Sequence, residues 1–294
     1  MDRGLTAGAV ALEDRIMSAT SQSTVTRLFD AMADDYDVLE PWYEHLYARV
    51  HAILRDELAP RPGKARALDA GCGHGAQTAL LRGLGYETHS ADIAERLLAL
   101  ARRRVPGARL ARADVTALPY RDATFDAVSC VGSTLSFVDD PDAACRELAR
   151  VLEPGGRLLL ECEHKWSLDL AWTFASALTG DPLDYGVSLR TVWSALRTRR
   201  DAPVVLPYPG YGELRLFSGR DLRRRLGAVG LRWERAWGIH ALTNVIPSTA
   251  LHRPTLPRSV MLLYRALRRL DDLVSGTALG RAAANSVVVL AVKR

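Results

Sequence analysis

The nine residues 67–75 read Ala-Leu-Asp-Ala-Gly-Cys-Gly-His-Gly, and this stretch decides how the rest of the 294-residue chain can be interpreted. A short apolar run at 67–70 passes directly into three alternating glycines, Gly71, Gly73 and Gly75. Glycine suits a backbone that turns tightly and approaches a ligand closely, because a Cβ atom would obstruct both. An amphipathic pattern at 76–83 follows, so the stretch predicts a strand, a glycine-rich turn and a helix. A turn without a ligand would show the same pattern, and the motif alone is weak evidence of binding.

The alternation of short apolar runs with amphipathic helices extends over much of the chain. It is typical of βαβ units, which build a parallel sheet with helices on both faces. Strands are predicted at 67–70, 87–91, 108–111, 127–131, 157–161, 231–237 and 287–292, and helices at 24–33, 42–58, 76–83, 95–105, 142–152 and 219–228. The sequence therefore predicts one α/β core domain.

Segments outside this alternation are expected to form a helical cap over the core. The first insertion has a predicted helix at 168–178 and a proline-rich loop at 203–211, and the second has a helix at 259–273. Insertions of this length more often serve a function than merely connect two elements. The resulting organisation is an N-terminal helical cap segment at 1–60, a ligand-binding core at 61–164, a cap insertion at 165–217, and the completion of the core at 218–294 with a second insertion at 238–284.

Two acidic residues stand at the ends of the strands that follow the glycine turn. Asp92 comes directly after the second predicted strand, about twenty residues beyond Gly71, where a carboxylate can accept hydrogen bonds from ribose hydroxyls. Asp114 follows the third predicted strand. The carboxyl ends of parallel strands meet at one edge of a sheet, where open α/β sheets bind ligands, so the turn and both acids predict a shared site.

These motifs resemble those of the class I S-adenosylmethionine-dependent methyltransferases, and within them the small-molecule enzymes similar to quinone-biosynthesis methyltransferases. The loop 69–75 is similar to the family's acid-x-Gly-x-Gly-x-Gly motif, and further similarity lies in Phe-Asp-Ala-Val at 125–128 and Arg-Val-Leu-Glu-Pro-Gly-Gly-Arg at 150–157. The resemblance implies a Rossmann-like, mostly parallel seven-stranded sheet whose last strand is antiparallel, with helices on both faces and a helical cap. It also implies S-adenosyl-L-methionine as the cofactor.

The same resemblance implies specific contacts to the cofactor. Asp92 would hold the ribose, Asp114 would meet the adenine amino group, and Val115 would offer a backbone contact. The motif 29–37 is similar to an N-terminal helix that closes over the methionine end, which would bring Tyr36 near the sulfonium or the acceptor, although Tyr36 could equally be a packing aromatic of the cap. The full expected set of cofactor-binding residues is Asp69, Gly71, Gly73, Gly75, Asp92, Ile93, Asp114, Val115 and Val131.

A nicotinamide dinucleotide is the competing cofactor for a glycine turn with a ribose-binding acid. Its loop normally has the spacing Gly-x-Gly-x-x-Gly. Here Gly71, Gly73 and Gly75 alternate, and Asp69 stands two residues before the first of them. This spacing favours S-adenosylmethionine.

The chemistry expected of such a site needs few catalytic groups. Methyl transfer from a sulfonium is an in-line displacement, so placement supplies much of the rate, and a base is needed only where the acceptor must lose a proton. Candidate acid/base residues follow the fifth and sixth predicted strands, at Glu163, His164 and His240. The predicted catalytic residues are His164, His240 and Tyr36, expected to converge over the transferred methyl group. Each histidine could instead be a hydrogen-bonded packing residue.

Charge and short motifs disfavour a nucleic-acid substrate. The formal charge of +5 resides almost wholly on arginine, in clusters at 102–104, 197–200, 223–225 and 268–269. These clusters lie on helical patterns without interleaved aromatics, which is typical of solvated helix faces. No Pro-Pro-Tyr follows the fourth predicted strand and no Pro-Cys dipeptide occurs, so DNA-modifying methyltransferases are disfavoured.

Cysteine usage and hydropathy indicate in which cellular compartment the protein works and which kinds of partner it has. The four cysteines form no CxxC pair and are expected to be buried in a reducing environment, and no metal site is predicted. No apolar run is long enough to cross a bilayer, and residues 1–20 lack a signal-peptide pattern. We therefore expect a cytoplasmic monomer or homodimer whose partner is a small-molecule acceptor, without nucleic acid or membrane.

The expected function is transfer of a methyl group from S-adenosylmethionine to an O, N or C atom of a small molecule, with a specialised metabolite as one hypothesis. The aromatic first insertion suits a planar or apolar acceptor, although its rings could equally be core between cap helices. These aromatics are Trp166, Trp172, Tyr185, Trp193, Tyr208, Tyr211 and Phe217. The alternatives are an RNA or protein methyltransferase and a non-catalytic S-adenosylmethionine-binding module.

Overall fold

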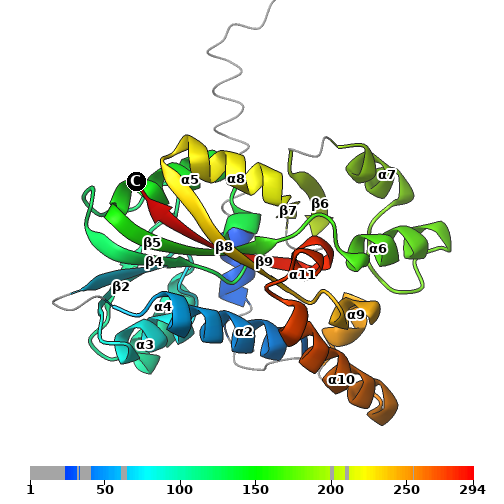
Figure 1. Cartoon of the computed structure of the whole chain (residues 1–294). Helices are drawn as coiled ribbons and strands as arrows, with labels where there is room; N and C mark the ends of the chain where they lie inside the picture. Colours follow the sequence, from blue (N-terminus) through cyan, green and yellow to red (C-terminus); the bar gives the residue numbers. More distant parts are fainter. Residues whose placement is uncertain are drawn as a thin grey trace, which may run out of the picture.

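A seven-stranded sheet forms the centre of the computed structural model, which describes residues 24–31, 33, 41–60, 65–198, 202–208, 212–253 and 255–294 (Figure 1). The strand order is β3-β2-β1-β4-β5-β9-β8. Neighbouring strands from β3 to β5 are parallel, whereas β9 runs antiparallel to both β5 and β8. The bounds are β1 Arg66–Ala70, β2 Glu87–Asp92, β3 Arg109–Arg112, β4 Phe125–Cys130, β5 Leu152–Glu163, β8 Leu231–Ile239 and β9 Ser286–Lys293. The predicted α/β architecture, with a mostly parallel sheet and an antiparallel last strand, is confirmed.

Helices cover both faces of this sheet (Figure 1). On one face α5 (Pro141–Val151) and α8 (Gly219–Ala228) share a buried apolar cluster with alternate strand residues. On the other face α2 (Pro41–Glu57) and α3 (Ala76–Gly83) pack against the intervening residues, and α4 (Glu95–Arg104) follows β2. Strands buried on both faces need apolar side chains in both directions, which explains the continuous Val-Val-Val-Leu-Ala-Val run of β9.

The two insertions follow β5 and β8. The first contains α6 (Leu168–Leu178), α7 (Leu189–Arg197) and an antiparallel hairpin of β6 (Val204–Tyr208) and β7 (Gly212–Leu216), which share a small apolar core of their own. The second contains α9 (Ser248–Leu251), α10 (Arg258–Val274) and α11 (Ala278–Ala283). Short 3-10 helices lie at η1 (Thr134–Phe137) after β4 and at η2 (Thr243–Val245) after β8.

The prediction of a proline-rich loop at 203–211 is wrong for 204–208, which form strand β6. Pro207 pairs with Glu213 in the hairpin, and proline is tolerated there because both strands of a two-stranded sheet are edge strands. Helix α7 was also not predicted, and of its apolar side chains only Val192 and Ala195 are buried in the small core of this insertion.

Strand β5 begins five residues earlier than predicted because its register with β4 contains an irregularity. Phe125 pairs with Leu152, yet Ala127 pairs with Arg157. The intervening Glu-Pro-Gly-Gly segment absorbs the extra residues, and Gly155 takes a φ of 75°. Glycine is required there because this left-handed conformation is costly for other residues.

The four cysteines, Cys72, Cys130, Cys145 and Cys162, are free and buried, as expected. Within the part of the chain that the structure describes, no helix has the length and apolar character needed to span a membrane.

Candidate functional site

A cavity lies at the carboxyl ends of β1, β2, β3 and β4, and the space within it, its opening to solvent included, is about 900 Å³. Short turns from these four strands form most of its wall, and residues of α2 and of the helical segment 24–31 close another side. Seven of the nine predicted cofactor residues line this one cavity: Gly71, Gly73, Asp92, Ile93, Asp114, Val115 and Val131.

The glycine turn needs all three glycines, but for different reasons. Gly71, Gly73 and Gly75 have φ angles of 78°, 51° and 86°, in the left-handed region that other residues rarely adopt. A Cβ atom on Gly71 would clash with the Thr134 hydroxyl, across the cavity wall. Gly75 does not line the cavity: it precedes α3, and a Cβ there would press against Ala101 of α4 at 3.1 Å. Gly75 is thus placed to pack α3 against α4.

Asp92 ties the glycine turn to the end of β2. One carboxylate oxygen, Oδ2, accepts a hydrogen bond from the backbone N–H of Gly73 at 2.7 Å, and Oδ1 accepts one from Ala94 at 2.9 Å. Burial raises the pKa of Asp92, and these backbone donors oppose that rise. A carboxylate oxygen has two lone pairs, so Asp92 retains acceptor capacity on the cavity side for hydroxyl donors.

Asp69 lies one layer behind the turn and is not part of the cavity wall. Its Oδ2 accepts a hydrogen bond from the hydroxyl of Thr78 at 2.7 Å, and that hydroxyl lies 2.9 Å from the hydroxyl of Ser90. Burial raises the pKa of Asp69 to about 7. The side chain therefore links β1, α3 and β2 beneath the residues that face the cavity.

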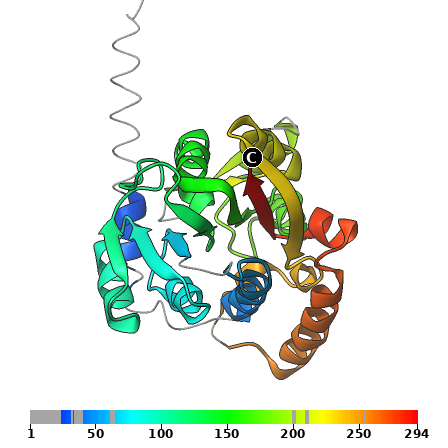
Figure 2. The ribbon, with the colours of Figure 1, turned by 60° about the vertical axis from the view of Figure 1, so that its left-hand side comes forward.

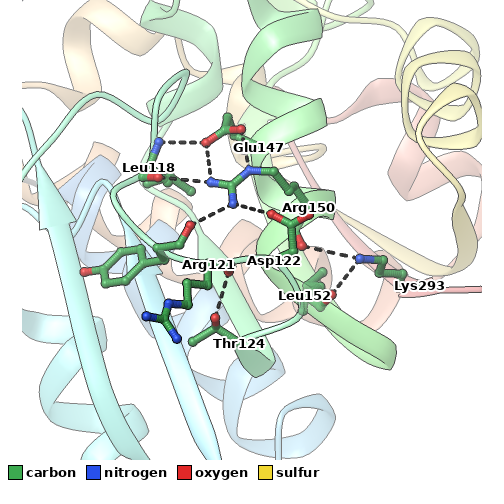
Figure 3. A network of polar contacts seen from close by, with 9 residues as sticks. Leu118, Arg121, Asp122, Thr124, Glu147, Arg150, Leu152 and Lys293 are labelled. Carbon is green, nitrogen blue, oxygen red and sulfur yellow. Dashed lines mark hydrogen bonds and ion pairs between the residues drawn. The ribbon is translucent and has the colours of Figure 1, made fainter.

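The loop after β3 forms a further wall, and a polar clamp fixes it (Figure 3). Asp114 accepts hydrogen bonds from the backbone and the hydroxyl of Thr116, both at 2.7 Å. The Arg150 guanidinium donates to the carbonyl oxygens of Leu118 and Tyr120 at 3.0 and 2.7 Å. Glu147 completes the clamp by accepting from the Leu118 N–H at 2.8 Å and pairing with Arg150 at 2.7 Å. The clamp holds in place the loop that carries Asp114, Val115 and Leu118 into the cavity.

Aromatic side chains that were not predicted as site residues line the remaining wall. Phe29 and Phe137 meet edge to face with ring centroids 5.4 Å apart, and Tyr47 of α2 lies across from Gly132 after β4. A Cβ on Gly132 would come within 3.8 Å of the Tyr47 hydroxyl. The sequence signal for Tyr47 was only its place on an amphipathic helix, which does not reveal the element that the helix faces.

Comparison with known proteins agrees with this geometry. Residues 68–160 match the model of a methyltransferase domain. The chain is 34% identical over 236 residues to a demethylmenaquinone methyltransferase of Beutenbergia cavernae, which covers 78% of this chain and 89% of that protein. It is 37% identical over 241 residues to the enzyme of the same name from Mycolicibacterium paratuberculosis, covering 78% of this chain and 94% of the relative.

Solved structures share the fold at lower identity. An S-adenosylmethionine-dependent methyltransferase from Thermotoga maritima superposes with a TM-score of 0.57 at 18% identity and covers 92% of this chain and all of that one. The 1,6-didemethyltoxoflavin-N1-methyltransferase of Burkholderia thailandensis superposes with a TM-score of 0.56 at 17% identity, covering 100% of this chain and 93% of that one.

The chain belongs to the class I S-adenosylmethionine-dependent methyltransferases. Its cavity fits that cofactor, because the buried acid Asp92 stands beside the glycine-rich turn and apolar residues such as Val115 and Leu118 flank the second acid, Asp114. When bound, S-adenosylmethionine supplies an electrophilic methyl group on a sulfonium.

Neither of the two histidines predicted for this methyltransferase site lines the cavity. His164 is buried against the returning insertion: its backbone N–H donates to Asn285, and its Nδ1 lies 3.1 Å from the Ala284 carbonyl oxygen. Burial lowers its pKa. The side chain is thus a hydrogen-bonded packing residue between β5 and the segment before β9.

His240 is enclosed by the second insertion. Its ring stacks on Trp42 of α2 with centroids 3.7 Å apart, its Nδ1 lies 2.9 Å from the Thr243 hydroxyl, and its backbone N–H donates to Asp271 of α10. Burial lowers its pKa well below the usual value. Tyr36, the third residue expected to converge here, lies outside the described residues.

Glu163, by contrast, lies beside the turn that separates two cavity-lining residues, Gly132 and Thr134. It accepts a hydrogen bond from the Ser133 hydroxyl at 2.9 Å, and Glu161 accepts one from the Ser133 backbone N–H at 2.6 Å. Burial and the neighbouring Glu161 charge raise the pKa of Glu163 to about 8. Ser133 has a φ of 60°, so the two carboxyl groups hold a strained residue between two residues of the cavity wall.

Proposed function

We propose that this methyltransferase acts on a small planar, apolar ring acceptor of the demethylated quinone class. The observation that carries the proposal is the continuity of the cavity from the cofactor residues to the rings of Phe29, Tyr47 and Phe137. Flat aromatic walls suit a flat apolar ligand. The relatives named demethylmenaquinone methyltransferases support the same class, because two of them align over 78% of this chain.

In this proposal the predicted cofactor residues have distinct roles. Asp92 accepts hydrogen bonds from the ribose, Asp114 and Val115 meet the adenine, and Gly71 and Gly73 let the backbone approach the methionine portion. Ile93 and Val131 complete the apolar wall. Their common place in the lining of one cavity supports these assignments. Asp69 and Gly75 act on the cofactor only through the turn that they hold.

Placement is proposed as the main source of the rate. An in-line displacement needs the acceptor atom held close to the methyl group, and positioning alone can lower the barrier by about 7–11 kcal/mol. Glu161 and Glu163 are positioning residues in this account, since they act through Ser133 on the wall between Gly132 and Thr134. The histidines at 164 and 240 are assigned to packing.

We also propose that nucleic acid is not the acceptor and that the protein works in the cytoplasm as a monomer or homodimer. Several cluster arginines are engaged within the molecule, which supports the first point. Arg225 binds Asp221 and Asp142, and Arg268 binds Glu44. Such pairs leave fewer cations for a phosphate backbone.

The direct test is transfer of a labelled methyl group from S-adenosylmethionine to a panel of a demethylated naphthoquinol, a malonyl thioester and bulk RNA. Labelling of the naphthoquinol, strongly reduced in Asp92→Ala at low cofactor concentration and kept in the control Asp126→Ala, is the expected result. Asp126 is a suitable control because it accepts a backbone hydrogen bond at the amino ends of the strands, opposite the cavity. Labelling of RNA or of the thioester alone would refute the proposed acceptor class, and binding without any transfer would favour a non-catalytic module.

A further inference from the structure

Helix α10 lies at the margin of the molecule (Figures 1 and 2), and the exposed leucines along it form an apolar stripe. Its inner side packs through Tyr264, which shares a buried cluster with Trp42, and through Asp271. On the outer side Leu262 and Leu273 are 67% and 77% exposed, and Leu263 and Leu270 are each 50% exposed. At 3.6 residues per turn these four leucines fall within a sector of about 100°. Scattered exposed leucines are ordinary, but a contiguous stripe marks an interaction surface.

Arginines border this leucine stripe. Arg258, Arg265 and Arg269 are exposed and project from the helix on one side of the stripe, by the same helical spacing. The two acids of the helix are engaged elsewhere: Asp271 is buried against His45, and Asp272 pairs with Arg49 of α2 at 3.0 Å. The outer side of α10 therefore combines apolar and cationic side chains, and the partly exposed carboxylate of Asp272, at the margin of the arginines, is paired with Arg49.

We infer that α10 docks the protein onto an anionic phospholipid surface, with the leucine stripe in the headgroup boundary and the three arginines against lipid phosphates. An amphipathic helix that lies in the interface plane has this pattern of apolar side chains flanked by cations. The inference goes beyond the methyl transfer proposed above and does not depend on the acceptor. It departs from the expectation of no membrane partner, which rested on the lack of a spanning segment.

A second copy of the chain fits this surface less well. Pairing two such stripes would bring the three bordering arginines of each copy together, and the one partly exposed acid beside them, Asp272, is already paired with Arg49. Like charges across an interface oppose association. An anionic surface has the complementary charge.

The test is co-sedimentation of the full chain with vesicles of phosphatidylcholine, with and without phosphatidylglycerol. Binding to the anionic vesicles, weakened by salt, is expected. Leu262→Ser combined with Leu273→Ser should lower the partition coefficient by about tenfold or more, because two exposed apolar contacts are lost. Arg265→Gln combined with Arg269→Gln should remove the preference for anionic lipid.

Matched controls change similar residues elsewhere. Leu178→Ser with Leu189→Ser alters two exposed leucines of the first insertion, and Arg102→Gln with Arg103→Gln alters two exposed arginines of α4. Both should bind vesicles like the parent protein, and all variants should bind S-adenosylhomocysteine normally, which shows that they are folded. The inference fails if the parent protein does not sediment with anionic vesicles, or if the α10 variants bind as well as the controls. Light scattering that shows a dimer dissolved by the leucine changes, without vesicle binding, would assign the stripe to self-association.

Discussion

Residues at the carboxyl ends of the strands have different roles in the two halves of the sheet. At the ends of β1 and β2 the chain passes into short turns and after β3 into the loop 113–124, and Gly73, Asp92 and Asp114 line the cavity. At the ends of β5 and β8 it passes into long insertions, and His164 and His240 are buried beneath them. A strand end therefore indicates a ligand contact when the next turn is short enough to leave it uncovered, and a packing role when an insertion covers it.

The largest effect on cofactor binding is expected from a side chain added at the ends of β1, β2 and β3. Gly73→Val should abolish detectable binding of S-adenosylmethionine, because the branched side chain would occupy the cavity and strain a backbone with a φ of 51°. Titration calorimetry measures the affinity, and circular dichroism checks the fold.

The matched control separates backbone strain from occupation of the site. Gly230 also has a positive φ, 79°, but an added Cβ would meet no atom within 4 Å. Gly230→Val should lose stability and keep its affinity for the cofactor. Binding retained in folded Gly73→Val would place the cofactor elsewhere.

Loss of a single hydrogen-bond acceptor from the cavity should have an intermediate effect on cofactor affinity. Asp92→Ala removes hydrogen bonds to a charged group worth about 1.5–3 kcal/mol, or roughly ten- to a hundredfold in affinity. Calorimetry of Asp92→Ala beside Asp126→Ala measures this effect. An unchanged dissociation constant for Asp92→Ala would remove its ribose role.

At the ends of β5 and β8, a substitution should change the stability of the fold. His240→Gln loses the stacking on Trp42 and should lower the free energy of unfolding by about 1–3 kcal/mol. Turnover per folded molecule should stay within about threefold of the parent, whereas loss of a general base costs about 10²–10⁴-fold. Chemical denaturation and steady-state kinetics on the same sample distinguish the two. A hundredfold loss of turnover with unchanged stability would restore His240 as a base.

A further expected effect is a pH dependence of stability that originates behind the glycine turn. The pKa of Asp69 is raised from 3.8 to about 7 in the folded protein, so its contribution to stability is present below about pH 4 and is lost as pH rises through about 7. Asp69→Asn should reduce the fall in stability over this range by at most about 1.4 kcal/mol per pH unit. Glu163, whose pKa is also raised, leaves a residual slope. Equal slopes in thermal unfolding of the parent and Asp69→Asn would contradict the buried position of Asp69.

The sequence predicted the core and the cofactor side of the site because both depend on local patterns. The periodicity of apolar residues predicts β1, α3 and β2, and the spacing of the glycines predicts the turn between β1 and α3. The wall made by Tyr47, Thr134 and Phe137 was not predicted, since it depends on which face of a helix or turn meets the cavity. The sequence left open whether His164 and His240 pack or act as a base, because burial beneath an insertion depends on how the insertion folds back.

The most direct test of the central claim is a crystal structure of the chain with S-adenosylhomocysteine. The ribose hydroxyls should lie within hydrogen-bonding distance of the Asp92 carboxylate, with the adenine beside Asp114 and Val115 and the sulfur facing the wall of Tyr47 and Gly132. A ligand bound at the ends of β5 and β8, among His164 and His240, would contradict the account.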